Sequence, residues 1–232
     1  MYRYFFLLIP LLSACEPNAE TTSTDKKAGA LHEQKIISRT VQDEMSPLGL
    51  WETHIEYPIF TNTSKSAALT EINNDISLMT EKYHCDNDKG EKQFTASITF
   101  LNDSVVSIQF ADTWLCEGMP HPDGRLGAIT YSIQTGKSIT LMDELVDSKR
   151  KDFSQKIIAQ LNQALKTKAD NNTCAQALNW SYFYLTKTGI AFVYTADDYS
   201  ESHCTSEVQI YTEDMQQYLN KDSILSRQPL NK

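Results

Sequence analysis

The sequence lacks an excess of basic residues. Its 232 residues include 21 lysines and arginines against 30 aspartates and glutamates, which gives a formal net charge of −9. Binding nucleic acid without sequence preference requires a basic face that displaces counterions, so the composition argues against nucleic acid as a partner. An acidic surplus is compatible with a basic protein partner, and it also keeps a protein soluble irrespective of function.

Motifs of several enzyme classes are also missing. The sequence has neither a Gly-x-Ser-x-Gly nucleophile elbow nor a His-Glu-x-x-His metal pair. Residues 135–138, Thr-Gly-Lys-Ser, look like the end of a phosphate-binding loop, but Tyr131 stands where that motif needs a glycine. Asp197, Asp198 and Glu201 could pair for glycoside hydrolysis, although acidic loops are usually only solvated. We therefore expect no catalytic site.

Histidines next to cysteines raise the question of a metal site. His84 and His203 each precede a cysteine, and His121 follows Cys116 by five residues. With reduced thiols, these side chains could be drawn as a zinc site. An exported chain meets an oxidising compartment, which favours disulfides instead. We therefore predict no metal and no other cofactor.

The N-terminal apolar run, residues 4–12, is too short to be a convincing membrane span and is typical of an export signal. Leu12-Ser13-Ala14-Cys15 resembles the bacterial lipobox, in which the cysteine thiol is lipidated and the chain is cut before it. The alternative is an ordinary cleaved signal peptide. Acyl chains on Cys15 would hold the protein on a membrane. Because Glu16 follows in place of a retention-favouring aspartate, we expect the outer membrane, facing the periplasm.

Four segments follow from the composition. Residues 1–15 are the signal and lipobox, and residues 16–46 are polar, poor in aromatics and typical of a flexible tether with a reach of roughly 30 Å. Residues 47–222 form the folded domain, and residues 223–232 form a tail. Hydrophobic residues make up 41% of the chain, which is enough for a core.

Periodicity predicts an α+β domain with a mainly antiparallel sheet, two longer helices and a short C-terminal helix. The first helix covers 66–83 and the second covers 147–168, where Phe153, Ile157, Leu161 and Leu165 form one stripe. A short helix capped by Thr212 ends at Leu219. The predicted strands cover residues 50–60, 94–100, 106–110, 125–133, 139–141, 180–185, 190–194 and 208–211.

Register can be predicted within two hairpins. A three-residue turn at 102–104 places Phe100 opposite Val106 and Ile98 opposite Ile108, so that apolar residues face one another. A four-residue loop in the last hairpin pairs Leu185 with Ile190 and Phe183 with Phe192 in the same way.

The register of the first hairpin, with its turn at 102–104, also indicates which cysteines lie close together. It places Cys116 opposite position 90, only five residues beyond Cys85, so a Cys85–Cys116 disulfide is plausible. Cys174 and Cys204 would then form the second bridge. Four cysteines in an exported chain suggest two disulfides, but three pairings are possible and sequence alone leaves the other two open.

Short motifs resemble the DUF3298 family, a domain of unknown function, over about residues 47–222. The matching motifs are Tyr57-Pro58, the helix bearing Asn73, Pro120-His121-Pro122, the strand–turn–strand at 131–141, Asp143-Glu144-Leu145, and 185–190. Family members occur beside polysaccharide deacetylases and in lysozyme-sensing anti-sigma factors. The run from Glu117 to Pro122 departs from the family's Gly-Gly-Ala-His-Pro. The resemblance implies a non-catalytic, envelope-facing recognition module.

Candidate ligand contacts are Trp114, His121, Arg125 and Tyr199, because aromatic and arginine side chains on or beside loops make good interface anchors. Trp114 shares strand parity with Phe110, so a core position is the alternative. We predict a membrane-anchored periplasmic lipoprotein that binds a protein, such as a cationic lysozyme, or a peptidoglycan ligand without catalysis. The alternatives are an enzyme or enzyme accessory acting on cell-wall glycan, and a purely structural envelope protein.

Overall fold

The computed structural model describes residues 33–43, 51–61, 66–82, 85, 90–168, 174, 176–195 and 204–227. The strands are β1 (Glu33–Asp43), β2 (Trp51–Thr61), β3 (Gly90–Leu101), β4 (Val105–Cys116), β5 (Asp123–Ser132), β6 (Tyr182–Leu185), β7 (Gly189–Thr195) and β8 (Thr205–Tyr211). The helices are α1 (Ala67–Glu81), α2 (Leu141–Glu144), α3 (Arg150–Lys168) and α4 (Thr212–Gln216), with a 3-10 turn at Asp147–Lys149.

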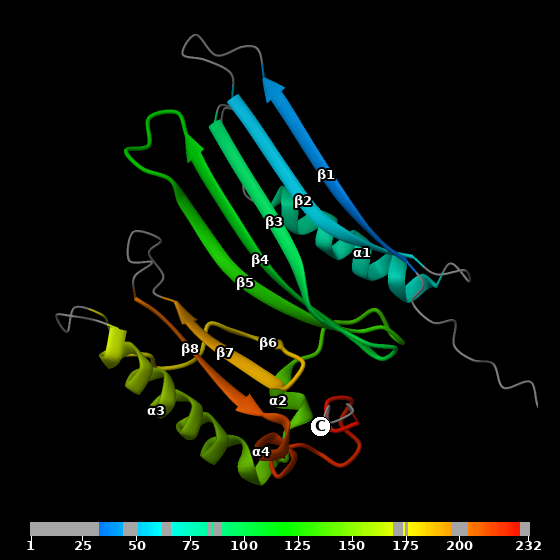
Figure 1. The fold of residues 1–232 in the computed structure, drawn as a ribbon, viewed down its shortest axis with the longest axis vertical. Helices are drawn as coiled ribbons and strands as arrows, with labels where there is room; N and C mark the ends of the chain where they lie inside the picture. The colour runs from blue at the N-terminus through cyan, green and yellow to red at the C-terminus, as the bar shows by residue number, and fades with distance from the viewer. Residues whose placement is uncertain are drawn as a thin grey trace, which may run out of the picture.

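The strands form two sheets in place of the one that the sequence suggested. A five-stranded sheet has the order β1-β2-β3-β4-β5, and a three-stranded sheet has the order β6-β7-β8. Every neighbouring pair is antiparallel except β2 and β3, which are parallel and joined through α1. The predicted α+β class with a mainly antiparallel sheet is confirmed, as are two longer helices, α1 and α3, and a short C-terminal one (Figure 1).

The helix α1 covers one face of the five-stranded sheet. Its apolar positions recur every three or four residues, so they form one stripe that packs on alternate residues of β4 and β5. The resulting core consists of Phe60, Leu69, Ile72, Ile76, Val106, Ile108 and Tyr131, all at most a few per cent exposed. Figure 1 shows α1 along one side of the large sheet beside β1 and β2, and hydrogen bonds from Tyr131 and Arg125 of β5 also reach it.

A second core lies between α3 and the three-stranded sheet. The stripe predicted on α3 is buried in full, and Phe153 packs against the rings of Trp180, Phe192 and Tyr218. The register predicted for β6 and β7 is confirmed, with Leu185 opposite Ile190 and Phe183 opposite Phe192.

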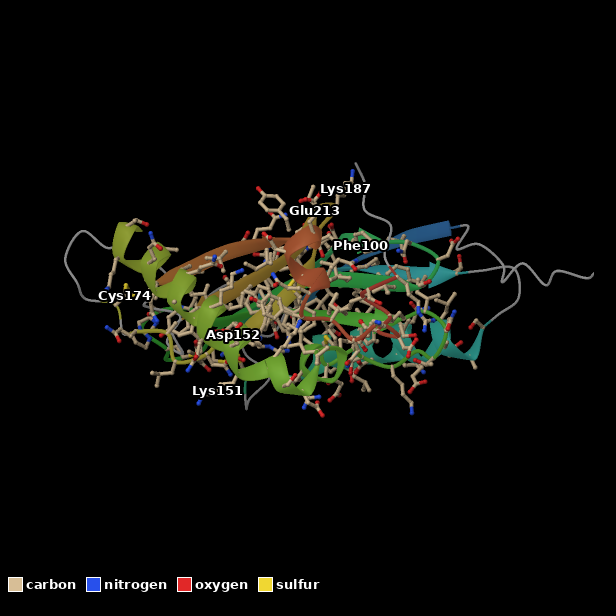
Figure 2. All side chains as sticks on the ribbon, turned by 90° about the horizontal axis from the view of Figure 1, so that it is seen from below. Phe100, Lys151, Asp152, Cys174, Lys187 and Glu213 are labelled. Carbon is tan, nitrogen blue, oxygen red and sulfur yellow. A yellow bond between two sulfur atoms is a disulfide. The ribbon has the colours of Figure 1, made fainter. Side chains whose placement is uncertain are left out.

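The two cores meet where β6 crosses the face of the large sheet that α1 leaves free. The backbone N–H of Leu185 donates to the Ser107 hydroxyl at 3.0 Å, and that hydroxyl lies 2.9 Å from the Thr130 hydroxyl. From the tip of the β3–β4 hairpin, Phe100 packs against the second core near Lys187 (Figure 2). Buried hydrogen bonds of this kind fix how the two sheets sit together.

The β3–β4 register departs from the prediction at one point. Ile98 lies opposite Ile108, as expected, but Phe100 lies opposite Ser107 and Leu101 opposite Val106. A bulge between Ile98 and Phe100 adds one residue to β3, which turns Phe100 away from the α1 side. The extra residue lets this side chain reach the second core.

Four further predictions need correction. Residues 33–43 form β1, so the tether prediction is wrong there, because backbone pairing with β2 needs no apolar run. Residues 139–141 form no strand, since a single bridge at Ser138 precedes α2. Thr212 does not cap α4, because its hydroxyl donates to the Thr188 carbonyl. The domain also extends past residue 222, since Leu225 is buried in the second core.

Candidate functional site

The face of the large sheet opposite α1 carries a continuous set of polar side chains, which we call the polar face. Register aligns His54, Gln93 and Thr113 in one row across β2, β3 and β4. Side chains alternate between the two faces of a strand, so their same-face neighbours follow at every second position. The polar face consists of His54, Glu56, Glu91, Gln93, Thr95, Ser97, Thr113 and Leu115.

A wide, open groove of about 500 Å³ lies at the end of this face that β6 leaves uncovered. It is lined by His54, Glu91, Lys92, Gln93, Thr113, Trp114, Leu115 and Pro122. The groove thus combines hydrogen-bonding side chains of the polar face with Pro122 and with Lys92 and Trp114, which register directs to the α1 side, so its lining comes from both faces of the sheet. Surfaces of this composition recognise ligands through polar contacts around an aromatic anchor.

The polar face is acidic. Among its side chains from β2 to β5, the two carboxylates are Glu56 and Glu91, and the described part of these strands directs no lysine or arginine to the same side. His54 lies beside one of them, with its Nε2 atom 4.0 Å from the Glu56 Oε2 atom. Clefts with one sign of charge attract oppositely charged ligands.

The small sheet marks the other end of the polar face. Tyr182 forms a side-chain hydrogen bond with Gln109 of β4, and burial raises the pKa of the Tyr182 hydroxyl. The hydroxyl of Tyr184 donates to the Glu207 carboxylate at 2.9 Å, which adds a third carboxylate on β8. Burial, followed by this hydrogen bond, raises the pKa of Tyr184.

A buried ionic cluster lies on the α1 side of the same strands. Asp112 is fully buried, with Oδ1 3.5 Å from the Lys92 ammonium and Oδ2 3.3 Å from the Arg125 guanidinium. Arg125 also donates to the carbonyl of Met79 in the last turn of α1 at 3.3 Å. Burial raises the pKa of Asp112 and lowers that of Lys92, and the attraction within the cluster opposes both shifts. The cluster fastens the C-terminal end of α1 to the sheet.

A disulfide closes the end of the sheet next to the groove. Cys85 is bonded to Cys116, and Gly90 lies opposite Cys116 in β3. A side chain at Gly90 would collide with the sulfur, because an added Cβ would lie 2.5 Å from Cys85 Sγ. Cys174 is bonded to Cys204 in the second half of the domain. The pairing favoured by register is the one present.

The structure separates the four candidate ligand contacts. Trp114 is half-buried and lines the groove, so it is neither a fully buried core residue nor a fully exposed one. His121 is exposed in the β4–β5 loop, with Nδ1 3.1 Å from the Pro122 carbonyl. Arg125 belongs to the ionic cluster on the opposite side, and Tyr199, like Cys15, lies outside the described residues.

Sequence reasoning missed the other groove residues. Gln93 and Thr113 lie just outside the predicted strands 94–100 and 106–110, and extending the alternation of those strands to them was the available signal. It shows which residues share a face but not which strands are neighbours. His54 joins the row only because β2 pairs in parallel with β3. Among the described residues, no three His, Cys, Asp or Glu side chains are grouped as metal ligands.

Similarity to known proteins is found by comparing structures and not by comparing sequences. No family model matches the chain, and no curated protein is similar to it. Its structure is similar to a DUF3298 family protein from Pseudomonas aeruginosa PAO1, with a TM-score of 0.62, 16% identity, and coverage of 81% of this chain and 94% of that one. The chain has a DUF3298-like fold.

A second DUF3298-like structure agrees with the first. The DUF3298 family member from Bacteroides fragilis NCTC 9343 has a TM-score of 0.54 and 14% identity, and the match covers 84% of this chain and 97% of that one. At these identities the likeness establishes the DUF3298-like fold alone, as the sequence motifs implied. None of the helices in the described ranges is long and apolar enough to span a bilayer.

Proposed function

We propose that this DUF3298-like protein is a non-catalytic recognition module of the bacterial envelope that binds a cationic, lysozyme-like protein on its polar face. The observation that carries the proposal is the groove, which brings Glu91, Gln93 and Thr113 of the polar face next to the half-buried Trp114, a residue that register directs with Lys92 to the α1 side. An aromatic anchor surrounded by hydrogen-bonding groups is the arrangement expected of a protein-binding surface.

Charge selects the kind of partner. Glu56 and Glu91 are the charged side chains that β2 to β5 direct to the polar face within the described ranges, and the whole chain has a net charge of −9. Lys92 also lines the groove, but its ammonium is paired with the buried Asp112 on the other side of the sheet. A cationic protein is steered to such a surface, whereas a neutral glycan gains no electrostatic steering from it. Cell-wall glycan is therefore the second candidate ligand and a separate arm of the test.

The proposal includes an anchor. A lipid on Cys15, following the signal at residues 1–15, would hold the domain on the envelope membrane, facing the periplasm. Mass spectrometry of the membrane fraction tests this part, because diacylglycerol and an amide-linked acyl chain on an N-terminal Cys15 give a defined mass increase. An unmodified chain cut at another site would contradict the anchor and leave the recognition proposal intact.

Calorimetric titration tests the recognition proposal. The chain from Glu16 onward, oxidised at its cysteines, is titrated with a cationic c-type lysozyme at physiological salt, and the muramidase activity of the mixture is measured. We expect saturable binding. A fall in muramidase activity would identify an inhibitor, and unchanged activity would identify a sensor. An absence of heat with lysozyme would contradict the proposal, and heat with a muropeptide disaccharide would move it to glycan.

A pair of double variants locates the site. Glu56→Gln with Glu91→Gln removes the two carboxylates that the described side chains of β2 to β5 place on the polar face, and Glu71→Gln with Glu213→Gln removes two exposed carboxylates from α1 and α4. Both proteins carry the same net charge. We expect the first to weaken binding about three- to tenfold, in line with exposed ion pairs, and the second to leave it unchanged. Equal weakening would show that attraction is general and not specific to the polar face.

A further inference from the structure

A second groove lies on the α1 side of the sheet, next to the free edge of β5. We call it the edge groove. It has a volume of about 590 Å³ and is lined by Asp75, Leu78, Met79, Glu81, Lys82, Phe110, Arg125, Ala128 and Ile129. The edge groove lies between α1 and β5, which are joined by the Tyr131–Asp75 hydrogen bond and by the bond from Arg125 to the Met79 carbonyl. The edge groove and the polar face lie on opposite sides of the sheet.

The floor of the edge groove is apolar. The Phe110 ring lies over Gly127 of β5, where an added Cβ would be 2.4 Å from the ring's Cζ atom. The Arg125 guanidinium covers the same ring at 5.2 Å from its centroid. On the helix side, Leu78 is 64% exposed. Leu78 thus joins Met79, Phe110, Ala128 and Ile129 in one apolar lining, and a contiguous apolar surface of this kind suits a partner.

The β5 strand also offers backbone groups for pairing. It is the last strand of the sheet, and within the described ranges its outer edge is engaged only at the end, by the Tyr131–Ser138 bridge and by the Ile139 N–H on the Thr130 carbonyl. Leu126, in the unpaired stretch, is 41% exposed on the polar-face side. Unpaired strand edges are templates for another strand, and here an exposed leucine flanks the edge on each side.

Charge distinguishes the occupant of this edge from the ligand of the polar face. The rim of the edge groove carries both signs, Asp75 and Glu81 against Lys82, and Asp75 is held by the Tyr131 hydroxyl at 2.6 Å. A surface with both signs can complement itself across a two-fold axis, whereas a surface with carboxylates alone repels its own copy.

We propose that the β5 edge is the interface of a homodimer, in which two β5 strands pair antiparallel across a two-fold axis. The two sheets then form one continuous sheet, and the two edge grooves face each other so that Leu78 of each copy is covered. The contact is isologous and closed, so it ends at the dimer. It leaves both polar faces accessible, so the dimer does not depend on the proposed recognition function.

Sedimentation velocity on the oxidised chain from Glu16 onward tests the dimer over a wide range of protein concentration. We expect the weight-average mass to rise to that of a dimer. Leu78→Glu places a carboxylate in the edge groove and should shift dissociation by at least tenfold. Leu178→Glu is the matched control, because Leu178 is 86% exposed elsewhere and should leave the dimer unchanged. A wild-type monomer at every concentration, or equal effects of both variants, would overturn the proposal.

A distance measurement locates the interface in the dimer. A nitroxide is attached to Leu126→Cys after the native disulfides have formed. Dipolar broadening of the continuous-wave electron paramagnetic resonance spectrum reports a short distance between the two labels, and pulsed measurements report a longer one. If the two-fold axis passes through Leu126, the two labelled positions face each other. Moving the axis by one residue along β5 separates the two Leu126 backbones by about 7 Å more. Any axis between Gly124 and Ala128 therefore gives a short distance. A dimer with a long distance, or with none in range, would contradict pairing through β5. Lysozyme titration of Leu78→Glu, expected unchanged, separates this result from the test of the polar face.

Discussion

Asn73 of α1 and Phe60 of β2 are joined by two hydrogen bonds. The Phe60 N–H donates to Asn73 Oδ1 at 2.9 Å, and Asn73 Nδ2 donates to the Phe60 carbonyl at 2.8 Å. The carboxamide therefore satisfies both backbone groups of a buried residue, as a neighbouring strand would. Asn162 of α3 makes the same pair of bonds with Ala177, at 2.8 and 2.9 Å. Each long helix is thus fastened to an adjacent chain segment by one amide.

Replacing Asn73 should destabilise the domain. Asn73→Ala leaves two buried backbone groups of Phe60 without partners, and each costs about 1–3 kcal/mol, so we expect a loss of about 2–4 kcal/mol. Urea unfolding followed by circular dichroism measures it. Asn74→Ala, at the exposed position beside it, is the control and should change stability by less than about 0.5 kcal/mol. Similar losses in both variants would show that the amide pair contributes little.

Gly136 is required for two reasons that can be separated. Its φ is +75°, and an added Cβ would lie 2.7 Å from the Ala68 carbonyl oxygen at the start of α1. Gly118 has a φ of +90° but no atom within 4 Å of the same position. We expect Gly118→Ala to cost about 1–2 kcal/mol for the backbone conformation alone. Gly136→Ala should cost about 2 kcal/mol more, as measured by urea unfolding. Equal costs would contradict a role for the close approach to α1.

The buried Tyr131 hydroxyl should make the free energy of unfolding depend on pH in the alkaline range. Burial, followed by its hydrogen bond to Asp75, raises the pKa of its hydroxyl above the ordinary value of 10. The stability that this shift represents is present below pH 10 and is lost as the pH rises, because the unfolded chain then releases a proton that the folded chain keeps. Tyr131→Phe should therefore flatten the decline in the free energy of unfolding between pH 10 and 11, by up to about 1.4 kcal/mol per pH unit.

The exposed Tyr211 provides the control for this prediction. Tyr211→Phe should keep the wild-type pH dependence, as measured by urea unfolding at closely spaced pH values. A decline as steep in Tyr131→Phe as in the wild-type protein would contradict the assignment of the proton to Tyr131.

The ionic cluster makes a prediction about Asp112. Asp112→Asn leaves the ammonium of Lys92 and the guanidinium of Arg125 near each other without a carboxylate between them. Removing one partner of a buried ion pair costs about 3–5 kcal/mol, and we expect a loss in this range by urea unfolding. Asp103→Asn, in the exposed β3–β4 turn, should be nearly neutral. A neutral Asp112→Asn would mean that the burial cost of the charges cancels their attraction.

Local patterns in the sequence predicted much of the fold. The three- and four-residue spacing of Phe153, Ile157, Leu161 and Leu165 marks the buried stripe of α3, because one helix face repeats at that interval. The alternation in the hairpins gave most of the register, and the register brought Cys85 close to Cys116. These inferences succeeded because each depends on residues that are near one another along the chain.

The missing parts depend on distant residues. The parallel pairing of β2 with β3 places His54 next to Gln93, and no spacing within either strand encodes that neighbour. Asp112 stands in a strand of mixed pattern, so its burial between Lys92 and Arg125 became evident only when three strands were aligned. The strand at residues 33–43 was missed because its stability comes from pairing with β2, and not from an apolar periodicity of its own.

The connectivity of the two disulfides affects how the chain matures. Each joins cysteines that are consecutive in the folded part, with sequence separations of 31 and 30. When a chain enters an oxidising compartment with its N-terminus first, Cys85 and Cys116 arrive before Cys174 and Cys204. For a chain exported in this way, oxidation in order of arrival would give the native bonds, so its maturation would require an oxidant but no enzyme to exchange wrong pairs.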